Sequence, residues 1–350
     1  MNRLRLIASI AALFVAGAQA QDVVLPEPSN RVRVAFYNVE NLFDTEDDPL
    51  TWDEEFLPEG SYQWTTYRYY KKLDQISKVF LNMGGWTVPG IIGMCEIENR
   101  RVLEDLLRFT GLQKFEYEIV HEDSPDARGI DVALLYRPDI FRYLQHDIIR
   151  IRMPFDTATK TRDVLYMSGI VAGDTLHVFV NHWPSRRGGQ EASQPKRVYV
   201  AEQVRLKVDS IFLLNSNAQI IVMGDLNDGP EDKSVSEALR AASKSDQMES
   251  PGLFNAMHAL RFKKGLGSHK YQGEWNALDH IILSSGLLDS ANTVYALPED
   301  VVIFQAPWLM EDDAQAPGQK PFRTYLGPRY IGGFSDHLPV YVDLRVRPKW

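Results

Sequence analysis

A short apolar run that ends in polar residues is the feature that most restricts how this chain can fold. Residues 220–223 are Ile, Ile, Val and Met, and Gly224 then precedes Asp225, Asn227 and Asp228. An apolar run broken by glycine predicts a buried strand that brings its last side chains to the edge of a sheet. Carboxylate and amide groups there can hold a hard cation or a phosphate, although Asp and Asn are also common in plain turns.

Polar clusters of the same kind are predicted at six strand junctions. They are Asn38/Glu40, Glu96, Asn181/His182, Asp225/Asn227, Asp279 and Asp336/His337. Turn chemistry explains any one cluster, but it explains poorly why every strand meets the same carboxylate, amide and imidazole groups. Phosphoryl transfer uses these groups: carboxylates hold Mg²⁺ or Mn²⁺, an imidazole paired with a carboxylate can activate water, and amides can donate to the charge of the transition state.

Apolar periodicity predicts the remaining elements. Strands are expected at residues 31–37, 90–95, 115–121, 132–136, 147–152, 164–171, 176–180, 281–283 and 340–346. Helices are expected over 65–83, 100–109, 195–214 and near 234–242. The Pro-rich stretch 285–330 is expected to be irregular. No linker or internal repeat divides the chain, so residues 21–350 are predicted to form one domain.

The N-terminus has the pattern of a secretory signal peptide. Two arginines precede the apolar residues 6–16, and Ala18-Gln19-Ala20 fits a small-residue cleavage site. Residues 1–20 are therefore predicted to be removed by cleavage after Ala20. The apolar stretch is too short to span a bilayer, so no stable membrane anchor is expected. We expect a secreted or periplasmic protein, and we expect it to be a monomer.

Charge and cysteine content limit the function. The formal net charge is −9, and because the first twenty residues hold two basic and no acidic residues, the rest carries −11. This argues against a broad basic groove for long nucleic acid, though not against a local basic site. Cys95 is the single cysteine and is expected to be buried and inert. The eight acidic residues of 44–59 predict a solvated loop, or a calcium site built from Asp44, Asp47, Asp48 or Asp53.

Six local motifs, in order, resemble one family. The motifs FYNVENLF, MCEIEN, VNHWPSR, MGDLND, LDHIILS and FSDHLPV are similar to those of the endonuclease/exonuclease/phosphatase superfamily over residues 31–346. Its members include pancreatic-type deoxyribonucleases, apurinic endonucleases, bacterial sphingomyelinases and inositol-polyphosphate 5-phosphatases. The resemblance implies an α/β (α+β) fold, a four-layer α/β sandwich of two packed mixed β-sheets flanked by helices, with the site at one end.

The resemblance also implies roles for the clustered residues. The metal-binding residues would be Glu96 as the main ligand, with Glu40, Asn38 and Asp336. Among the catalytic residues, Asp225 would orient or deprotonate the attacking water and Asn227 would stabilise the transition state. Asp279 and His337 would form a carboxylate–imidazole pair, and His182 would donate to the scissile phosphate.

Four further residues are predicted to bind substrate, with alternatives left open. Arg186 and Arg187 lie in a Gly-flanked loop that either binds a phosphate or is a solvated basic turn. Arg162 resembles an arginine that contacts phosphate in the nuclease branch. Asp131 lies near the position of a carboxylate that pairs with the equivalent of His182, with the register off by about one residue.

Other polar residues are expected to be structural. Asn99 is expected to cap a helix, and His280 and Asp228 are expected to face outward or to cap a turn. His258 and His269 have no motif support.

Three functions follow from this pattern. The first is an exported Mg²⁺-dependent phosphodiesterase, an endonuclease; Mn²⁺ suits the same ligands, and Ca²⁺ could serve as a structural ion. The second is a phospholipase C/sphingomyelinase-type or phosphomonoesterase enzyme acting on lipid headgroups or small phosphates, for which only Phe304, Trp308 and Leu309 offer an apolar surface. The third, a binding protein without activity, is disfavoured because every expected catalytic group is present.

Overall fold

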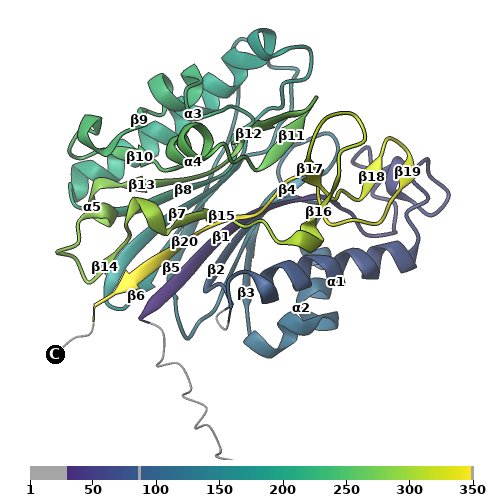
Figure 1. The fold of residues 1–350 in the computed structure, drawn as a ribbon, viewed down its shortest axis with the longest axis horizontal. Coiled ribbons are helices and arrows are strands. Elements are labelled where there is room, and N and C mark those ends of the chain that lie inside the picture. The colour runs from purple at the N-terminus through teal and green to yellow at the C-terminus, as the bar shows by residue number, and fades with distance from the viewer. Residues whose placement is uncertain (1–29, 86–87, 348–350) are drawn as a thin grey trace, which may run out of the picture.

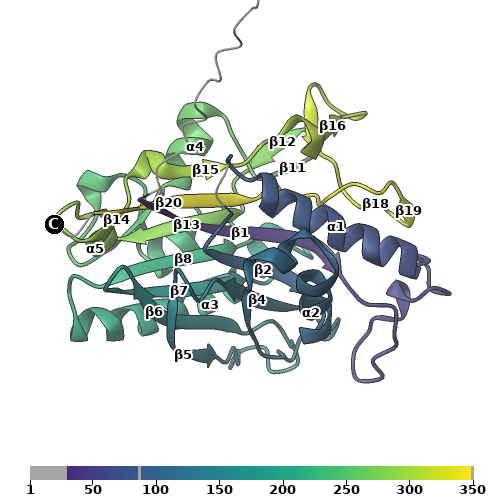
Figure 2. The same cartoon turned by 90° about the horizontal axis from the view of Figure 1, so that it is seen from below.

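The computed structural model describes residues 30–85 and 88–347, and these form four layers. Two mixed sheets of seven strands pack face to face, and helices cover their outer sides (Figures 1 and 2). The predicted four-layer α/β sandwich is confirmed. The predicted signal peptide lies outside the described residues. Within the described ranges, no helix has the length and apolar character needed to cross a bilayer.

The first sheet has the strand order β14-β20-β1-β2-β4-β3, and β15 also pairs with β20. Its strands are β1 (Arg31–Leu42), β2 (Ile91–Ile97), β3 (Glu118–His121), β4 (Asp131–Tyr136), β14 (Val294–Tyr295), β15 (Val301–Ile303) and β20 (Val340–Val346). Strands β1 and β2 are parallel, and Asn38 pairs with Cys95. The two strands therefore end at the same edge, where Asn38 and Glu96 meet.

The second sheet has the strand order β5-β6-β7-β8-β13-β10-β9. Its strands are β5 (Arg142–Ile149), β6 (Val164–Val171), β7 (Asp174–His182), β8 (Gln219–Asp225), β9 (Ala241–Ala242), β10 (Leu253–Asn255) and β13 (Asp279–Ser284). Strands β7 and β8 are parallel and end with His182 beside Asp225. Antiparallel β13 begins at Asp279, also opposite Asp225, so three strand ends meet at one point.

Three short hairpins extend from the sandwich. They are β11 (His269–Tyr271) with β12 (Glu274–Asn276), β16 (Met310–Asp312) with β17 (Gln319–Pro321), and β18 (Tyr325–Leu326) with β19 (Arg329–Tyr330). Helices α1 (Thr66–Asn82) and α2 (Arg100–Phe109) lie beside the first sheet and α3 (Gln190–Leu214) beside the second (Figure 2). Two shorter helices are α4 (Met257–Lys264) and α5 (Ser285–Leu288).

Strand β8 is continuously apolar because each of its two faces packs against a different apolar core. Ile221 and Met223 belong to the core between the sheets, whereas Ile220 and Val222 belong to a second core that includes the buried face of α3. Both faces of the strand are therefore buried. Packing between the sheets is tight here, because a Cβ on Gly93 would lie 2.6 Å from Met223 Cε.

One predicted helix begins earlier in the structure than expected. The helices over 65–83 and 100–109 are confirmed as α1 and α2, but the predicted start of α3 at Pro195 is wrong, because α3 begins at Gln190. The early turn is stabilised by side chains: Ser193 Oγ donates to the carbonyl of Gly189 at 2.7 Å and Arg197 Nη2 to that of Gln190 at 3.0 Å. Proline near a helix start costs little because few N–H groups there have a partner within the helix.

The remaining differences concern short elements. The helix predicted near 234–242 is one π-helical turn, Ser234–Ala238, followed by β9, which pairs with β10. The strand predicted at 147–152 begins earlier, as β5, and the one at 115–121 is shortened to β3 by a 3₁₀ turn at Gly111–Phe115. The stretch 285–330 contains α5 and several short strands, so it is not irregular throughout. Cys95 is buried, as predicted.

Candidate active site

One carboxylate oxygen lies at the centre of the predicted site. Asn38 Nδ2 donates to Asp225 Oδ2 at 3.0 Å, and the Nε2 atoms of His182 and His337 lie 3.7 Å and 3.8 Å from the same oxygen. All four side chains are buried. Asn38 belongs to the first sheet and Asp225 to the second, so the site lies at the seam between the two sheets.

The predicted pair of Asp279 and His337 is formed. His337 Nδ1 lies 2.7 Å from Asp279 Oδ2, a hydrogen-bonding distance. Backbone contacts fix both residues: the N–H of Asp279 donates to Ser268 Oγ, and that of His337 donates to Ser335 Oγ. Burial alone would lower the pKa of His337, but the carboxylates of Asp279 and Asp225 outweigh it and hold that pKa well above its usual value. The imidazole therefore carries a proton at neutral pH.

The backbone after β8 presents Asn227 to the site. Gly224 has φ +152°, and a Cβ there would lie 2.3 Å from the carbonyl oxygen of Asn181, so the neighbouring strand requires glycine at this position. Asn227 has φ +51°, a left-handed conformation that Asn tolerates better than most residues. Its N–H donates to Asp225 Oδ1 at 2.9 Å and its Nδ2 to the carbonyl of Trp183 at 3.1 Å.

Glu96 has one carboxylate oxygen held by the backbone. The N–H of Asn41 donates to Glu96 Oε2 at 2.9 Å, and Oε1 lies 4.0 Å from His182 Nε2. Glu96, Glu40 and Asn41 all have positive φ, between +53° and +64°. The pairing of β1 with β2 shifts register between Asn38 and Leu42, so a bulge, and not regular alternation, turns these side chains into the site.

Glu40 is part of a charged cluster that the sequence did not predict. Arg323 Nη2 lies 3.0 Å from both Glu40 Oε1 and Asp336 Oδ2, and the N–H of Thr324 donates to Glu40 Oε2 at 2.7 Å. Lys72 is buried and donates to Thr324 Oγ1 and to the backbone carbonyl of Phe334. Burial and Asp336 raise the pKa of Glu40 to about 7, and burial lowers that of Lys72 to about 8 despite the nearby carboxylates.

This donor set fits a hard divalent cation. Glu40 and Asp336 lie together because both contact the Arg323 guanidinium, and the charge of Glu96 also acts on Arg323 and Lys72. Such cations prefer oxygen ligands, and a concentration of buried carboxylates is stabilised by added positive charge. Glu96 Oε1 accepts no hydrogen bond from the described residues, whereas both oxygens of Glu40 accept from Arg323 and Thr324. Glu96 is therefore the natural first ligand, with Glu40, Asp336 and Asn38 around it.

The buried titratable groups differ in their protonation. Burial raises the pKa of Asp225 to about 7, with Asp279 adding to the effect and His337 opposing it. Burial, together with the positive charges of Arg162 and Arg128, keeps the pKa of His182 well below its usual value. The site therefore holds a neutral imidazole, a protonated imidazole and a carboxylate of raised basicity around one point, an arrangement suited to moving a proton from water.

Comparison with known proteins identifies the family. The family model described as "Endonuclease/Exonuclease/phosphatase family" matches residues 33–346. This chain belongs to that family. It is accordingly a phosphoric ester hydrolase that depends on a divalent metal. No curated protein sequence matches the chain significantly.

Solved structures of the family share the fold at low sequence identity. The human nocturnin catalytic domain with bound sulfate is 16% identical with TM-score 0.54, covering 91% of this chain and 96% of that one. D. rerio TDP2 complexed with a single-strand DNA product is 15% identical with TM-score 0.52, covering 90% and 98%. A family protein from Bacteroides thetaiotaomicron is 16% identical with TM-score 0.53, covering 91% and 98%.

The two loop arginines differ in their surroundings. Arg186 is tied to the loop after β8, because its Nε donates to the carbonyl of Asn227 at 2.8 Å and its Nη2 to Asp232 Oδ2 at 3.0 Å. Arg187 is exposed, and no hydrogen bond or ion pair to it is found in the described part of the chain. Arg187 is thus the freer of the two to meet a phosphate, while Arg186 orients the backbone of Asn227.

The other two residues predicted to bind substrate lie deeper. Arg162 is buried and donates to Asp126 Oδ2 at 3.0 Å and to the carbonyl of Trp183 at 2.8 Å, beside the site. Asp131 does not form the expected pair with His182. Its Oδ2 lies 3.2 Å from His121 Nε2, and His182 Nδ1 has no hydrogen-bond partner among the described residues. The one-residue register difference noted in the sequence places Asp131 at the start of β4, on the His121 side.

Some residues have other surroundings than predicted. His280 and Asp228 do not face outward: both are fully buried, and His280 Nε2 contacts the carbonyl of Asp228 at 2.9 Å. His269, which had no motif support, pairs with His337 in a β-bridge, and the two rings lie 4.7 Å apart. Asn99 caps α2 as predicted, accepting from the N–H of Val102.

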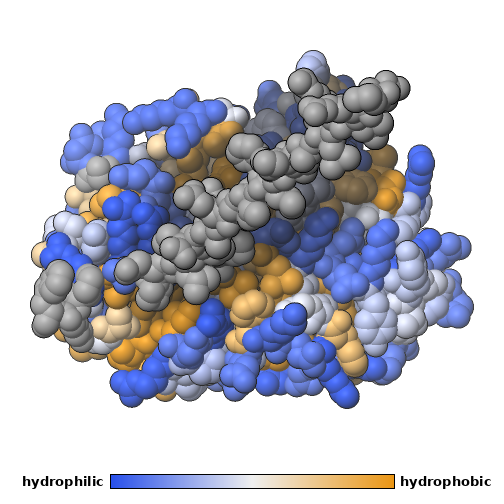
Figure 3. Space-filling model, turned by 60° about the horizontal axis from the view of Figure 1, so that its bottom comes forward, coloured by the Kyte–Doolittle hydropathy of each residue, from blue (hydrophilic) through white to orange (hydrophobic). Residues whose placement is uncertain are grey.

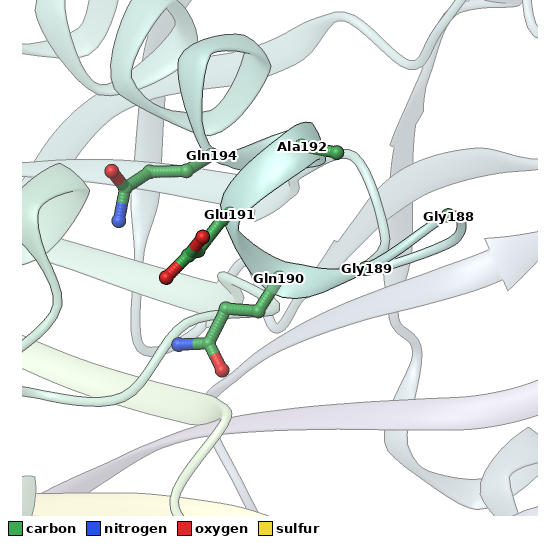
Figure 4. Close-up of a pocket in the computed structure, with 6 residues that line it drawn as sticks. All are labelled: Gly188, Gly189, Gln190, Glu191, Ala192 and Gln194. Atoms are coloured by element: carbon green, nitrogen blue, oxygen red, sulfur yellow. The ribbon is translucent and has the colours of Figure 1, made fainter.

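A surface hollow beside the start of α3 is separate from this site. It is lined by Gly188, Gly189, Gln190, Glu191, Ala192 and Gln194 (Figure 4). None of these residues belongs to the cluster around Asp225. The candidate catalytic groups around Asp225 Oδ2 are instead buried where the two sheets meet.

Proposed function

We propose that this family member is an exported endonuclease that hydrolyses phosphodiester bonds of nucleic acid. The observation that carries the proposal is the convergence of Asn38, His182 and His337 on Asp225 Oδ2, with Glu96 Oε1 4.0 Å from His182. A phosphate placed between Glu96 and His182 would face donors on one side and the basic carboxylate on the other. The single-strand DNA product in the similar D. rerio TDP2 structure supports a nucleic-acid substrate.

The chain's own residues supply the proton and charge chemistry. Asp225 accepts the proton of the attacking water, because its raised pKa makes it a stronger base than a solvated carboxylate. Protonated His337, oriented by Asp279, donates to a phosphate oxygen as negative charge develops there. Asn227 and neutral His182 donate through Nδ2 and Nε2 to the same group, and such preorganised donors lower the barrier.

The metal in this proposal is Mg²⁺, for which Mn²⁺ can substitute. It would be held by Glu96, with Glu40, Asp336 and Asn38, and would neutralise negative charge on the reacting phosphate. A structural Ca²⁺ in the acidic loop is a further part of the proposal. Asp44, Asp53 and Glu98 are buried there, and Asp53 Oδ1 has no hydrogen-bond partner among the described residues.

Phosphate contacts outside the centre are assigned to basic residues around the site. Arg187 would contact the substrate backbone directly. Arg162 and Arg186 would support it with positive charge from positions fixed by the backbone carbonyls of Trp183 and Asn227, respectively. Residues 21–350 carry a formal net charge of −11, so the protein would contact only a short stretch of the nucleic-acid backbone.

The alternative, cleavage of lipid headgroups, is less well supported. Leu309 is buried, and Trp308 packs on Phe334 and Phe304, so these side chains do not form an apolar surface for lipid. On the face shown in Figure 3, apolar areas lie between hydrophilic ones. The residues predicted as a signal peptide, 1–20, support export, and we propose that the protein is released as a monomer.

A substrate panel tests the proposal. Purified protein is incubated with supercoiled plasmid, RNA, sphingomyelin and a phosphomonoester, each with Mg²⁺ or with EDTA, and Glu96→Gln is assayed in parallel. We expect metal-dependent nicking of plasmid that Glu96→Gln abolishes while its circular dichroism spectrum is unchanged. Intact plasmid together with release of lipid headgroup or of inorganic phosphate would replace the endonuclease with the alternative enzyme.

A further inference from the structure

The connection between β3 and β4 holds a second group of metal-ligating side chains. His121 ends β3, Asp131 begins β4, and Asp123 lies in the connection between them. One ligand atom from each residue lies within 4.8 Å of the other two. The His121 and Asp131 side chains are 2% and 3% exposed, whereas Asp123 is 86% exposed. The group therefore combines a buried floor with one ligand open to solvent.

The two buried side chains face each other without a hydrogen bond. His121 Nε2 lies 3.2 Å from Asp131 Oδ2, and this buried nitrogen has no contact of hydrogen-bond geometry among the described residues. The other oxygen, Oδ1, accepts from both the N–H and the hydroxyl of Ser124. Asp131 is thus held in place with Oδ2 left for another partner.

This geometry matches two ligands of one cation. A histidine nitrogen and a carboxylate oxygen that each lie about 2.1 Å from a zinc ion are roughly 3 to 3.5 Å apart. A mixed set of one imidazole and two carboxylates suits a borderline dication better than a hard one. We propose that His121, Asp131 and Asp123 form a binding site for a transition-metal dication such as Zn²⁺, with water completing the coordination.

The site would fix the connection between β3 and β4. Asp126 lies in the middle of that connection and accepts from Arg162, which also donates to the carbonyl of Trp183 beside the catalytic cluster. A cation bound at both ends of the connection shortens the chain that is free to move. It would stabilise residues 122–130 without contributing any group to the catalytic cluster.

Anomalous diffraction and equilibrium dialysis test the site. Crystals are soaked in Zn²⁺ and data are collected at the zinc edge, while dialysis at micromolar Zn²⁺ gives the number of ions per chain. We expect an anomalous peak about 2.1 Å from His121 Nε2. We also expect His121→Gln to bind one ion fewer than the wild type. The matched control is His146→Gln, a histidine on β5 that lies 3.6 Å from Glu122 and outside the group; it should bind as many ions as the wild type.

A proteolysis assay supplies a second readout. The Arg128–Gly129 bond lies in the connection, and we expect Zn²⁺ to slow its cleavage by trypsin at least fivefold in the wild type and in His146→Gln, but not in His121→Gln. If His121→Gln does not fold, the exposed Asp123→Asn decides, with at least tenfold weaker zinc binding expected. The absence of a peak at His121, unchanged stoichiometry in the variants, or binding only at millimolar zinc would each overturn the proposal.

Discussion

The carboxylate of Asp279 and the imidazole of His337 connect the two sheets of the sandwich across 2.7 Å. Asp279 is the first residue of β13 in the second sheet, and His337 lies just before β20 of the first. The orientation of the imidazole therefore depends on how the sheets pack. An error of one residue in the register of either strand would separate the pair, because successive side chains of a strand point to opposite faces.

The first prediction concerns this pair. Asp279→Asn should lower kcat by about 10²-fold or more, because the amide no longer stabilises the protonated ring of His337. His337→Ala should lower kcat by a similar factor. The double variant should be little worse than either single one, since the two residues act as a unit. Initial rates on a chromogenic phosphodiester measure this, and multiplicative losses would show that the residues act independently.

The sequence was sufficient to predict which side chains meet around Asp225. Asp225, Asn227 and His182 follow apolar strands, and because β7 and β8 are parallel neighbours, their ends meet. A continuously apolar run such as 220–223 has a clear physical cause in this fold, burial on both faces. These features are local in the sequence, so periodicity alone could reveal them.

Residues that reach the site from distant parts of the sequence could not be predicted from local periodicity. Arg323 reaches Glu40 from a position 283 residues further along the chain, in a stretch without strong periodicity. His269 reaches His337 through an isolated bridge from a three-residue strand. The burial of His280 and Asp228 depends on Asn255 and Arg197, which are also far away in sequence. Local patterns carry no information about such contacts.

The second prediction concerns Arg323. Replacing it with Ala leaves the carboxylates of Glu40 and Asp336 without their shared guanidinium. The free energy of unfolding in EDTA should therefore fall by about 1–2 kcal/mol. This loss is smaller than for a fully buried pair because the Arg323 side chain is 35% exposed. Mg²⁺ or Mn²⁺ should restore more of the melting temperature in this variant than in the wild type, since the cation replaces the lost charge. Differential scanning calorimetry with and without metal measures both effects. Equal metal-induced shifts in the two proteins would contradict the assignment.

The third prediction concerns the buried ion pair of Arg197 and Asp228. Both side chains are fully buried, and Arg197 Nε lies 2.7 Å from Asp228 Oδ2. Asp228→Asn should destabilise the protein by about 3 kcal/mol, because it leaves the guanidinium buried without its counterion. Urea denaturation measures the change. Asp232→Asn, at a carboxylate that pairs with the more exposed Arg186, is the matched control and should cost about 1 kcal/mol or less.

The last prediction concerns the pH dependence of stability at His177, on β7. Burial, assisted by the charge of Lys207, lowers the pKa of His177 from 6.5 to about 4, and Tyr166 Oη lies 2.8 Å from its Nδ1. The unfolded chain therefore binds a proton at this residue below pH 6.5 while the folded chain does not. The stability that His177 contributes is complete above pH 6.5 and is lost as the pH falls toward 4.

His177→Gln tests this sign, because glutamine can accept the tyrosine hydroxyl without titrating. Between pH 6.5 and 4.5, the free energy of unfolding should fall by about 2 kcal/mol more in the wild type than in the variant. Urea titrations at several pH values give the slopes. Parallel pH profiles of the wild type and His177→Gln would show that folding does not lower the pKa of His177.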